Sequence, residues 1–272
     1  MCGILAILNI DAARSNPAEL RRQALGMARK LRHRGPDWSG IYSDDQAILA
    51  HERLSIVDVE HGAQPLFDTG NGNVLAVNGE IYNHKTLRKG LRAEHDFQTS
   101  SDCEVILYLY DEAFAEDPKV WLNAMNGIFA FALHDPRRRT CMLARDPMGV
   151  VPLYVGWDEA GNLYAASEMK ALVGQCGRIE EFPPGCYYLG HESEKGFQRY
   201  YAPAWAVPGF VPDRPYDPAV LREALEAAVH RQLMCDVPYG LLISGGVDSS
   251  LIAAIASRYR KGQIFRPAKV AE

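Results

Sequence analysis

The 272-residue sequence has no excess of basic residues. It contains 29 Lys and Arg against 34 Asp and Glu, so its formal net charge at pH 7 is −5. Proteins that bind nucleic acid generally gather positive charge to neutralise phosphates. The composition therefore argues against nucleic acid as a partner, and the three arginines at 137–139 are predicted to lie in a solvated turn.

The sequence also lacks paired cysteines and long apolar stretches. Its six cysteines show no Cys-x-x-Cys spacing, and its histidines show no spacing typical of metal ligands. The apolar run from Ile4 to Ile10 is too short to span a bilayer, and no positively charged leader precedes it. We therefore expect a protein of a reducing compartment, the cytoplasm, that has no membrane anchor.

Short apolar or alternating runs dominate positions 2–201 and predict strands. These runs are 3–10, 48–57, 74–77, 128–134, 141–145 and 163–166. Apolar residues at helical spacing predict a helix over 18–31, and Ser101 with Glu104 has the sequence of a capping box at the start of another helix. Many strands with few helices indicate an α+β domain of stacked antiparallel sheets covered by helices.

A second region, 217–272, follows a proline-rich linker at 202–216. Its predicted elements are a helix from Asp217 and Pro218, a buried strand over 239–243, a glycine-rich loop over 244–250 and a helix over 251–259. This order predicts the start of an α/β domain. Because a lone strand cannot bury both of its faces, the domain is expected to be incomplete.

Cys2 directly follows Met1, and a side chain this small permits enzymatic removal of the methionine. The cysteine would then carry a thiol and a free α-amino group on one residue. An amine with a pKa of about 7.7–8.0 can accept the thiol proton near neutral pH. The alternative is that Cys2 is a small apolar residue at the start of the first strand, which is the commoner role.

Acyl transfer also needs donors to a developing oxyanion and groups that hold the substrate. Asn78 and Gly79 can supply an amide and a main-chain N–H, although Asn-Gly by itself is a common turn, for which a hairpin is the default explanation. Arg53 lies in an otherwise apolar stretch and predicts a bound anion, or else a rim arginine on an edge strand. Asp102 falls in the first turn of a predicted helix, where the helix dipole alone accounts for an acidic residue.

Five motifs, in this order, resemble the class II glutamine amidotransferase domain. They are Met-Cys-Gly-Ile at 1–4, Arg-His-Arg-Gly-Pro-Asp at 32–37, His-Glu-Arg-Leu-Ser-Ile at 51–56, Asn-Gly-Glu-Ile-Tyr-Asn at 78–83 and Ser-Asp-Cys-Glu at 101–104. Further matches at 145–146, 152–154, 166–172 and 244–250 make the sequence similar to the glutamine-dependent asparagine synthetases. The resemblance implies an N-terminal-nucleophile αββα sandwich over 2–201, followed by the start of an ATP-pyrophosphatase-like domain.

The resemblance implies a role for each matching residue. Cys2 would attack the side-chain amide of glutamine, and Asn78 with the Gly79 main chain would form the oxyanion hole. The implied glutamine-binding residues are Arg53 for the α-carboxylate, Asp102 and the Gly79-Glu80 region for the α-amino group, and the extended backbone of Ile56 and Val57 along the pocket. Specificity for glutamine would follow from this charge pairing.

The segment 244–250 resembles the pyrophosphate-binding loop of ATP pyrophosphatases. Glycines let main-chain N–H groups approach phosphate, and the following helix directs its positive end at the same point. The implied ATP-binding residues are Leu242, Ser244, Gly245, Gly246, Asp248 and Ser249, with Asp248 also a ligand of Mg²⁺. An ordinary Gly-Gly turn before a helix is the alternative.

Members of this family use ATP and Mg²⁺ to transfer ammonia from glutamine to aspartate. They continue well past the loop at 244–250, so the sequence is expected to be truncated, with glutamine hydrolysis as the surviving activity and no asparagine formed by this chain alone. The alternatives are a glutaminase subunit that supplies ammonia to a separate synthetase chain, and a non-catalytic remnant. The partner protein is expected to be a second copy of the chain, in a homodimer, or a separate synthetase chain. Ser100 stands where the family often has glycine, so its backbone is expected to be less able to adopt a positive φ.

Overall fold

The chain divides into two compact units in the computed structural model, which describes residues 1–213 and 215–259. Contacts between Cα atoms define a first unit over Met1–Val207 and a second that begins at Pro208. Residues 260–272, the last part of the predicted second region, lie outside the described residues.

Two antiparallel sheets of six strands each form the centre of the first unit. The first sheet has the order β10-β8-β9-β1-β3-β2, with bounds β10 (Arg178–Glu181), β8 (Tyr154–Trp157), β9 (Leu163–Ala166), β1 (Gly3–Leu8), β3 (Ile48–Arg53) and β2 (Trp38–Ser43). The second has the order β12-β11-β7-β6-β5-β4, with bounds β12 (Gln198–Arg199), β11 (Cys186–Leu189), β7 (Thr140–Arg145), β6 (Gly127–Asp135), β5 (Val74–Ile81) and β4 (Leu66–Phe67).

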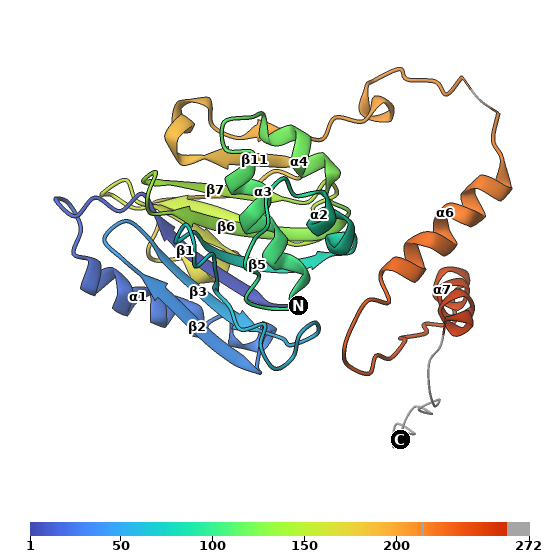
Figure 1. The fold of residues 1–272 in the computed structure, drawn as a ribbon, viewed down its shortest axis with the longest axis horizontal. Helices are drawn as coiled ribbons and strands as arrows, with labels where there is room; N and C mark the ends of the chain where they lie inside the picture. The colour runs from blue at the N-terminus through green and yellow to red at the C-terminus, as the bar shows by residue number, and fades with distance from the viewer. Residues whose placement is uncertain (214, 260–272) are drawn as a thin grey trace. The chain divides into compact units, whose positions relative to one another are not determined.

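Helices cover the outer face of each sheet, as Figure 1 shows. Leu20 and Met27 of α1 (Pro17–Arg29) pack on the outer face of β1 and β3. On the second sheet, α3 (Val105–Glu112) and α4 (Pro118–Ala124) cover the apolar face of β5 and β6. The remaining short helices of this unit are α2 (His84–Gly90), α5 (Met169–Leu172) and the 3₁₀ turns η1 (Arg32–Arg34), η2 (Asp102–Glu104), η3 (Gly190–Lys195) and η4 (Ala204–Ala206).

The inner faces of the two sheets meet in a shared core. Ile4, Ala6 and Leu8 of β1 point into this core, whereas Leu5 and Ile7 point to the α1 side. Because both faces of β1 are covered, all six of its residues are buried, and its sequence is a continuous apolar run rather than an alternating one. The four layers confirm the predicted αββα sandwich.

The strands predicted within residues 2–201 all form, most of them with shifted ends. The Asn78-Gly79 pair lies inside β5 rather than in a hairpin turn, because β5 runs to Ile81. In contrast, β3 ends at Arg53, so the predicted strand over 48–57 was too long. The predicted helix over 18–31 begins at Pro17, where the Asn16 side chain accepts hydrogen bonds from the N–H groups of Ala18 and Glu19.

The predicted capping box at Ser101 is only half formed. The Ser101 hydroxyl accepts a hydrogen bond from the Cys103 N–H, 3.4 Å away, at the start of η2. The Glu104 carboxylate instead accepts from the N–H groups of Gln98 and Thr99, at 2.6 and 2.8 Å. Glu104 therefore holds the segment that precedes the helix rather than closing on Ser101.

In the second unit, α6 (Pro218–Arg231) packs against α7 (Val247–Arg258). The helix predicted to start at Asp217 and Pro218 forms, and the Asp217 side chain caps it by accepting from the Ala219 N–H at 2.8 Å. The predicted strand over 239–243 is wrong: the segment is irregular, and the described residues of this unit offer no neighbouring strand to pair with it. The predicted helix over 251–259 begins earlier, at Val247, and this shortens the glycine-rich loop.

All six cysteines have free thiols. Within the part of the chain that the structure describes, no helix combines the length and apolar character needed to cross a membrane.

Truncation of a side chain between the sheets tests the importance of the shared core. Leu143 of β7 is completely buried there, so Leu143→Ala should lower the free energy of unfolding by about 2–5 kcal/mol. Val120 is 69% exposed, and Val120→Ala should change it by less than about 0.5 kcal/mol. Urea denaturation of both variants measures the difference, and equal effects would contradict the assignment of the core.

Candidate active site

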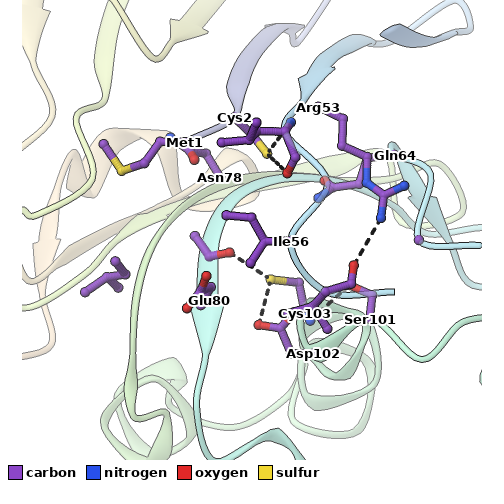
Figure 2. A pocket seen from close by; sticks show the side chains of 15 residues that line it. Met1, Cys2, Arg53, Ile56, Gln64, Asn78, Glu80, Ser101, Asp102 and Cys103 are labelled. Carbon is purple, nitrogen blue, oxygen red and sulfur yellow. Dashed lines mark hydrogen bonds between the residues drawn. The ribbon is translucent and has the colours of Figure 1, made fainter. Parts of the chain in front are cut away.

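A cavity of about 70 Å³, open to solvent, lies in the first unit where β1, β3 and β5 approach one another (Figure 2). It gathers every residue predicted to bind or attack glutamine, namely Cys2, Arg53, Ile56, Val57, Asn78, Gly79, Glu80 and Asp102. The other lining residues are Met1, Leu54, Gly62, Gln64, Ser101, Cys103 and Ile128. Five separate parts of the sequence, at 1–2, 53–64, 78–80, 101–103 and 128, therefore converge on one site.

Cys2 lies immediately before β1 with its sulfur at the cavity. Its Sγ is 3.3 Å from the N of Leu54 and 3.5 Å from the O of Leu54, while the Nε of Arg34 donates to the Cys2 carbonyl at 2.8 Å. Burial raises the pKa of the Cys2 thiol, although the Leu54 hydrogen bond and nearby positive charges act in the opposite direction. The thiol is therefore protonated at neutral pH and needs a base to become a nucleophile.

The edge of β5 next to Asn78 is hydrogen-bonded by side chains rather than by a neighbouring strand. Past the end of the short strand β4, the N–H of Val77 donates to Oε1 of Gln64 at 2.8 Å, and the Val77 carbonyl accepts from Nε2 of His51 at 3.0 Å. Burial lowers the pKa of His51 to about 4, so its ring stays neutral. The Asn78 side chain is 1% exposed, yet its Nδ2 has no acceptor among the described residues. A buried donor of this kind is costly unless a ligand supplies the acceptor.

Gly79 follows with a φ of +148°, which only glycine adopts readily. A Cβ at this position would lie 2.0 Å from the carbonyl oxygen of Ile128. Along a strand, alternate residues direct their N–H groups to the same side. The Gly79 N–H therefore points to the same edge as that of Val77, away from β6, where the cavity opens.

The Arg53 side chain is 6% exposed and holds the loop that follows β3. Its Nη1 donates to the carbonyl of Val59, and its Nη2 donates to those of Val57 and Asp58. A Cβ at Gly62 would lie 2.7 Å from Nη2, so glycine is needed for this close approach. The bound groups are main-chain carbonyls, and the guanidinium retains donors for an anionic ligand in the cavity.

Asp58 connects this loop to the segment that carries Asp102. It has a φ of +50°, and its Oδ2 accepts from the Ser100 N–H at 2.7 Å. Ser100 itself has no positive φ. A serine where the family often has glycine therefore introduces no backbone strain. This hydrogen bond links the side of the cavity that carries Arg53 to the side that carries Asp102.

Two carboxyl groups form the acidic side of the cavity. Burial and the neighbouring charge of Asp102 raise the pKa of Glu80 to about 7. Burial also raises the pKa of Asp102, opposed by the Ile81 N–H, which donates to its Oδ2 at 2.6 Å. A positively charged amine placed between these groups would offset their mutual repulsion.

The residues predicted to bind ATP lie in the second unit, and all are solvent exposed except Ser249, which is partly buried. Gly245 has a φ of +86°, Gly246 precedes the first turn of α7, and no side chain caps that helix. The Oγ atoms of Ser244 and Ser249 are 3.0 Å apart at the same turn. These groups fit a phosphate.

The Leu242 side chain is 99% exposed, and Asp248 belongs to no cluster of metal-ligating residues within the described ranges, so the contacts to adenine and Mg²⁺ remain predictions.

Sequence reasoning missed Arg34, Leu54 and Gln64 as parts of the site. Arg34 and Leu54 lie within quoted motifs, which were the available signal. Leu54 acts through its main chain, and Gln64 through one side-chain hydrogen bond, so residue type alone identifies neither.

Comparison with known families agrees with this geometry. The glutamine amidotransferase domain family matches residues 1–201, and the asparagine synthase family matches residues 220–270. The chain therefore belongs to the glutamine amidotransferase domain family.

Its similar relatives are glutamine-hydrolysing asparagine synthetases. Asparagine synthetase B (glutamine-hydrolyzing) of Escherichia coli strain K12 is 51% identical over 259 residues, which cover 95% of this chain and 45% of the relative. The Brassica oleracea asparagine synthetase (glutamine-hydrolyzing) is 48% identical over 263 residues, 96% of this chain and 43% of the relative. The chain spans a little under half the length of these relatives.

The fold is shared with a more distant solved structure. Glutamine phosphoribosylpyrophosphate amidotransferase from B. subtilis, solved with ADP and GMP, superposes with a TM-score of 0.58 at 20% identity. The superposition covers 98% of this chain and 69% of that one. At this identity the likeness supports the fold assignment only.

The raised pKa of Glu80 predicts a pH-dependent cost in stability. Between about pH 4.5, the ordinary value, and about pH 7, the folded protein keeps a proton that the unfolded chain loses, so the free energy of unfolding falls as the pH rises. Glu80→Gln should therefore raise the unfolding temperature at about pH 8 and change it little at about pH 4.5. Thermal denaturation at both pH values, with exposed Glu159→Gln as the control, measures this. Equal effects of Glu80→Gln at both values would contradict it.

Proposed function

We propose that the chain hydrolyses the side-chain amide of glutamine to glutamate and ammonia, with Cys2 as the nucleophile. The observation that carries this proposal is the Nδ2 of Asn78, a buried donor without an acceptor among the described residues, in the same cavity as the Cys2 sulfur. Such a donor is suited to the oxygen of a carbonyl that the sulfur attacks.

The first half of the reaction forms a thioester. After removal of Met1, the α-amine of Cys2 takes the thiol proton, and the thiolate attacks the amide carbon of glutamine. The electron pair of the carbonyl moves to oxygen, where Asn78 Nδ2 and the Gly79 N–H donate to it. When the carbonyl re-forms, the carbon–nitrogen bond breaks, and the protonated amine gives its proton to the departing ammonia.

The second half releases glutamate. The α-amine removes a proton from water, the hydroxide attacks the thioester carbon, and the same two donors hold the oxyanion again. The carbon–sulfur bond then breaks and the thiolate recovers its proton. Met1 lines the cavity, so its removal both exposes the amine and enlarges the space for substrate.

Charge at the two sides of the cavity favours an α-amino acid as substrate. Arg53 would bind the α-carboxylate, and Asp102 with the Gly79-Glu80 region would bind the α-ammonium group. The main chain of Ile56 and Val57 would line the space between them. The side-chain amide of glutamine would then extend toward Cys2.

Similarity to the synthetases extends the proposal to the use of the ammonia. The acceptor would be aspartate activated with ATP and Mg²⁺, by a domain to which 217–272 contribute and which the linker 202–216 joins to the amidotransferase domain 2–201. Ser244, Gly245, Gly246 and Ser249 fit the phosphate part of ATP, and Leu242 and Asp248 would contact adenine and Mg²⁺. A second copy or a separate synthetase chain as partner, and a cytoplasmic location, stay predictions from the sequence.

Two substitutions test the proposal. Cys2→Ala removes the nucleophile and should abolish the release of ammonia from glutamine. Asn78→Ala removes one oxyanion donor and should lower kcat by about 10²–10³-fold with a smaller effect on KM. An enzyme-coupled glutamate assay measures both.

Asn123→Ala and Cys176→Ala are the matched controls, because both residues lie outside the cavity. They should retain activity within about threefold, since neither change removes a group that lines the cavity. Undiminished turnover by Cys2→Ala, or by Asn78→Ala, would refute the roles assigned to these residues.

A further inference from the structure

The Gln64 side chain makes the hydrogen bond to β5 that the main chain of a longer β4 would ordinarily make. Leu66 of β4 pairs with Leu75 of β5, so continuation of β4 would place the main chain of residue 64 opposite Val77. Instead, the Gln64 side chain reaches Val77, and its Oε1 accepts the Val77 N–H at 2.8 Å. The main chain of Gln64 turns toward β2, where a Cβ at Gly40 would lie 1.9 Å from the Gln64 carbonyl oxygen.

This hydrogen bond fixes the orientation of the Gln64 amide. A main-chain N–H can only donate, so the atom that meets Val77 is the amide oxygen, and the nitrogen lies on the other branch. The Gln64 Nε2 makes no hydrogen bond with any of the described residues. Gln64 lines the same cavity as Arg53 (Figure 2), so its amide can donate to a ligand there.

Arg53 alone offers few donors to such a ligand. Its Nη2 hydrogens are taken by the carbonyls of Val57 and Asp58, and one Nη1 hydrogen is taken by that of Val59. Only the Nε–H and the second Nη1 hydrogen remain. A carboxylate has more acceptor sites than these two donors satisfy, and an unsatisfied carboxylate in a partly buried site is costly.

We propose that Gln64 is a specificity-determining residue that donates from Nε2 to the α-carboxylate of the bound amino acid, beside Arg53. The inference rests on the proposed function for the identity of the substrate. In this proposal the Gln64 side chain has two roles. Its oxygen holds the main chain that precedes Asn78, and its nitrogen recognises a negative charge without adding a second positive one.

Two variants separate the hydrogen bond to Val77 from the hydrogen bond to the carboxylate. Gln64→Glu retains an acceptor for the Val77 N–H but places a negative charge where the donor was. Gln64→Met has nearly the same length and offers neither group. Kinetics with L-glutamine and with its α-methyl ester, which lacks the carboxylate charge, are measured at about pH 8, where a glutamate side chain is ionised.

For Gln64→Glu, KM for glutamine should rise at least about tenfold with kcat within about threefold, and KM for the methyl ester should change less than about threefold. Gln64→Met should also raise KM for glutamine, and should in addition lower kcat, because the Val77 main chain loses its partner. An equal loss on both substrates, or an unchanged KM for glutamine, would overturn the inference.

Binding without turnover distinguishes failure of this inference from failure of the proposed function. In a Cys2→Ala background, isothermal titration calorimetry should show that Gln64→Glu weakens L-glutamine binding at least about tenfold. If the unsubstituted chain bound glutamine but did not hydrolyse it, the proposed activity would be wrong while the role of Gln64 still stood. If Gln64→Glu did not fold, judged by its unfolding midpoint, unchanged binding by Gln64→Met would overturn the inference.

Discussion

The main-chain path of β5 from Val77 to Gly79 is the constraint on which the site depends. Both main-chain polar groups of Val77 are bonded by side chains, Gln64 and His51, rather than by a strand. Gly79 takes a conformation and a contact distance that exclude a Cβ. Between them, the Nδ2 of Asn78 is buried without an acceptor among the described residues. Its orientation is therefore set before a ligand arrives, which is the condition for stabilising a developing charge.

The surroundings of Cys2 explain why the base must come from the same residue. Among the described residues, its sulfur bonds only to the main chain of Leu54, and burial raises the pKa of its thiol. No histidine or carboxylate that could accept the proton contacts the sulfur in the part of the chain described. The α-amine released by loss of Met1 would supply that base, and its charge would also suit a cavity whose far side carries Glu80 and Asp102.

Local sequence patterns predicted the layers better than the contacts within the site. The apolar runs of β1 and β5 and the start of α6 depend on neighbouring residues, and they formed as expected. The strand over 239–243 did not form, because a strand needs a partner that no local pattern can guarantee. The grouping of Cys2, Arg53, Asn78 and Asp102 came from resemblance to a family, and spacing alone could not have given it. Gln64 and Asp58 act through hydrogen bonds to residues distant in the sequence, which leave no mark on composition or periodicity.

The central claim is that the Cys2 sulfur attacks the side-chain carbonyl carbon of glutamine. Incubation with 6-diazo-5-oxo-L-norleucine tests it directly, because the diazomethyl carbon of this glutamine analogue, next to the carbonyl that replaces the amide, alkylates a nucleophile held there with loss of N₂. Peptide mass spectrometry should find a single adduct, on a peptide that begins with Cys2 and has lost Met1, and excess L-glutamine should prevent its formation. An unmodified Cys2, an adduct on another cysteine such as Cys103, or labelling of a chain that retains Met1 would contradict the account.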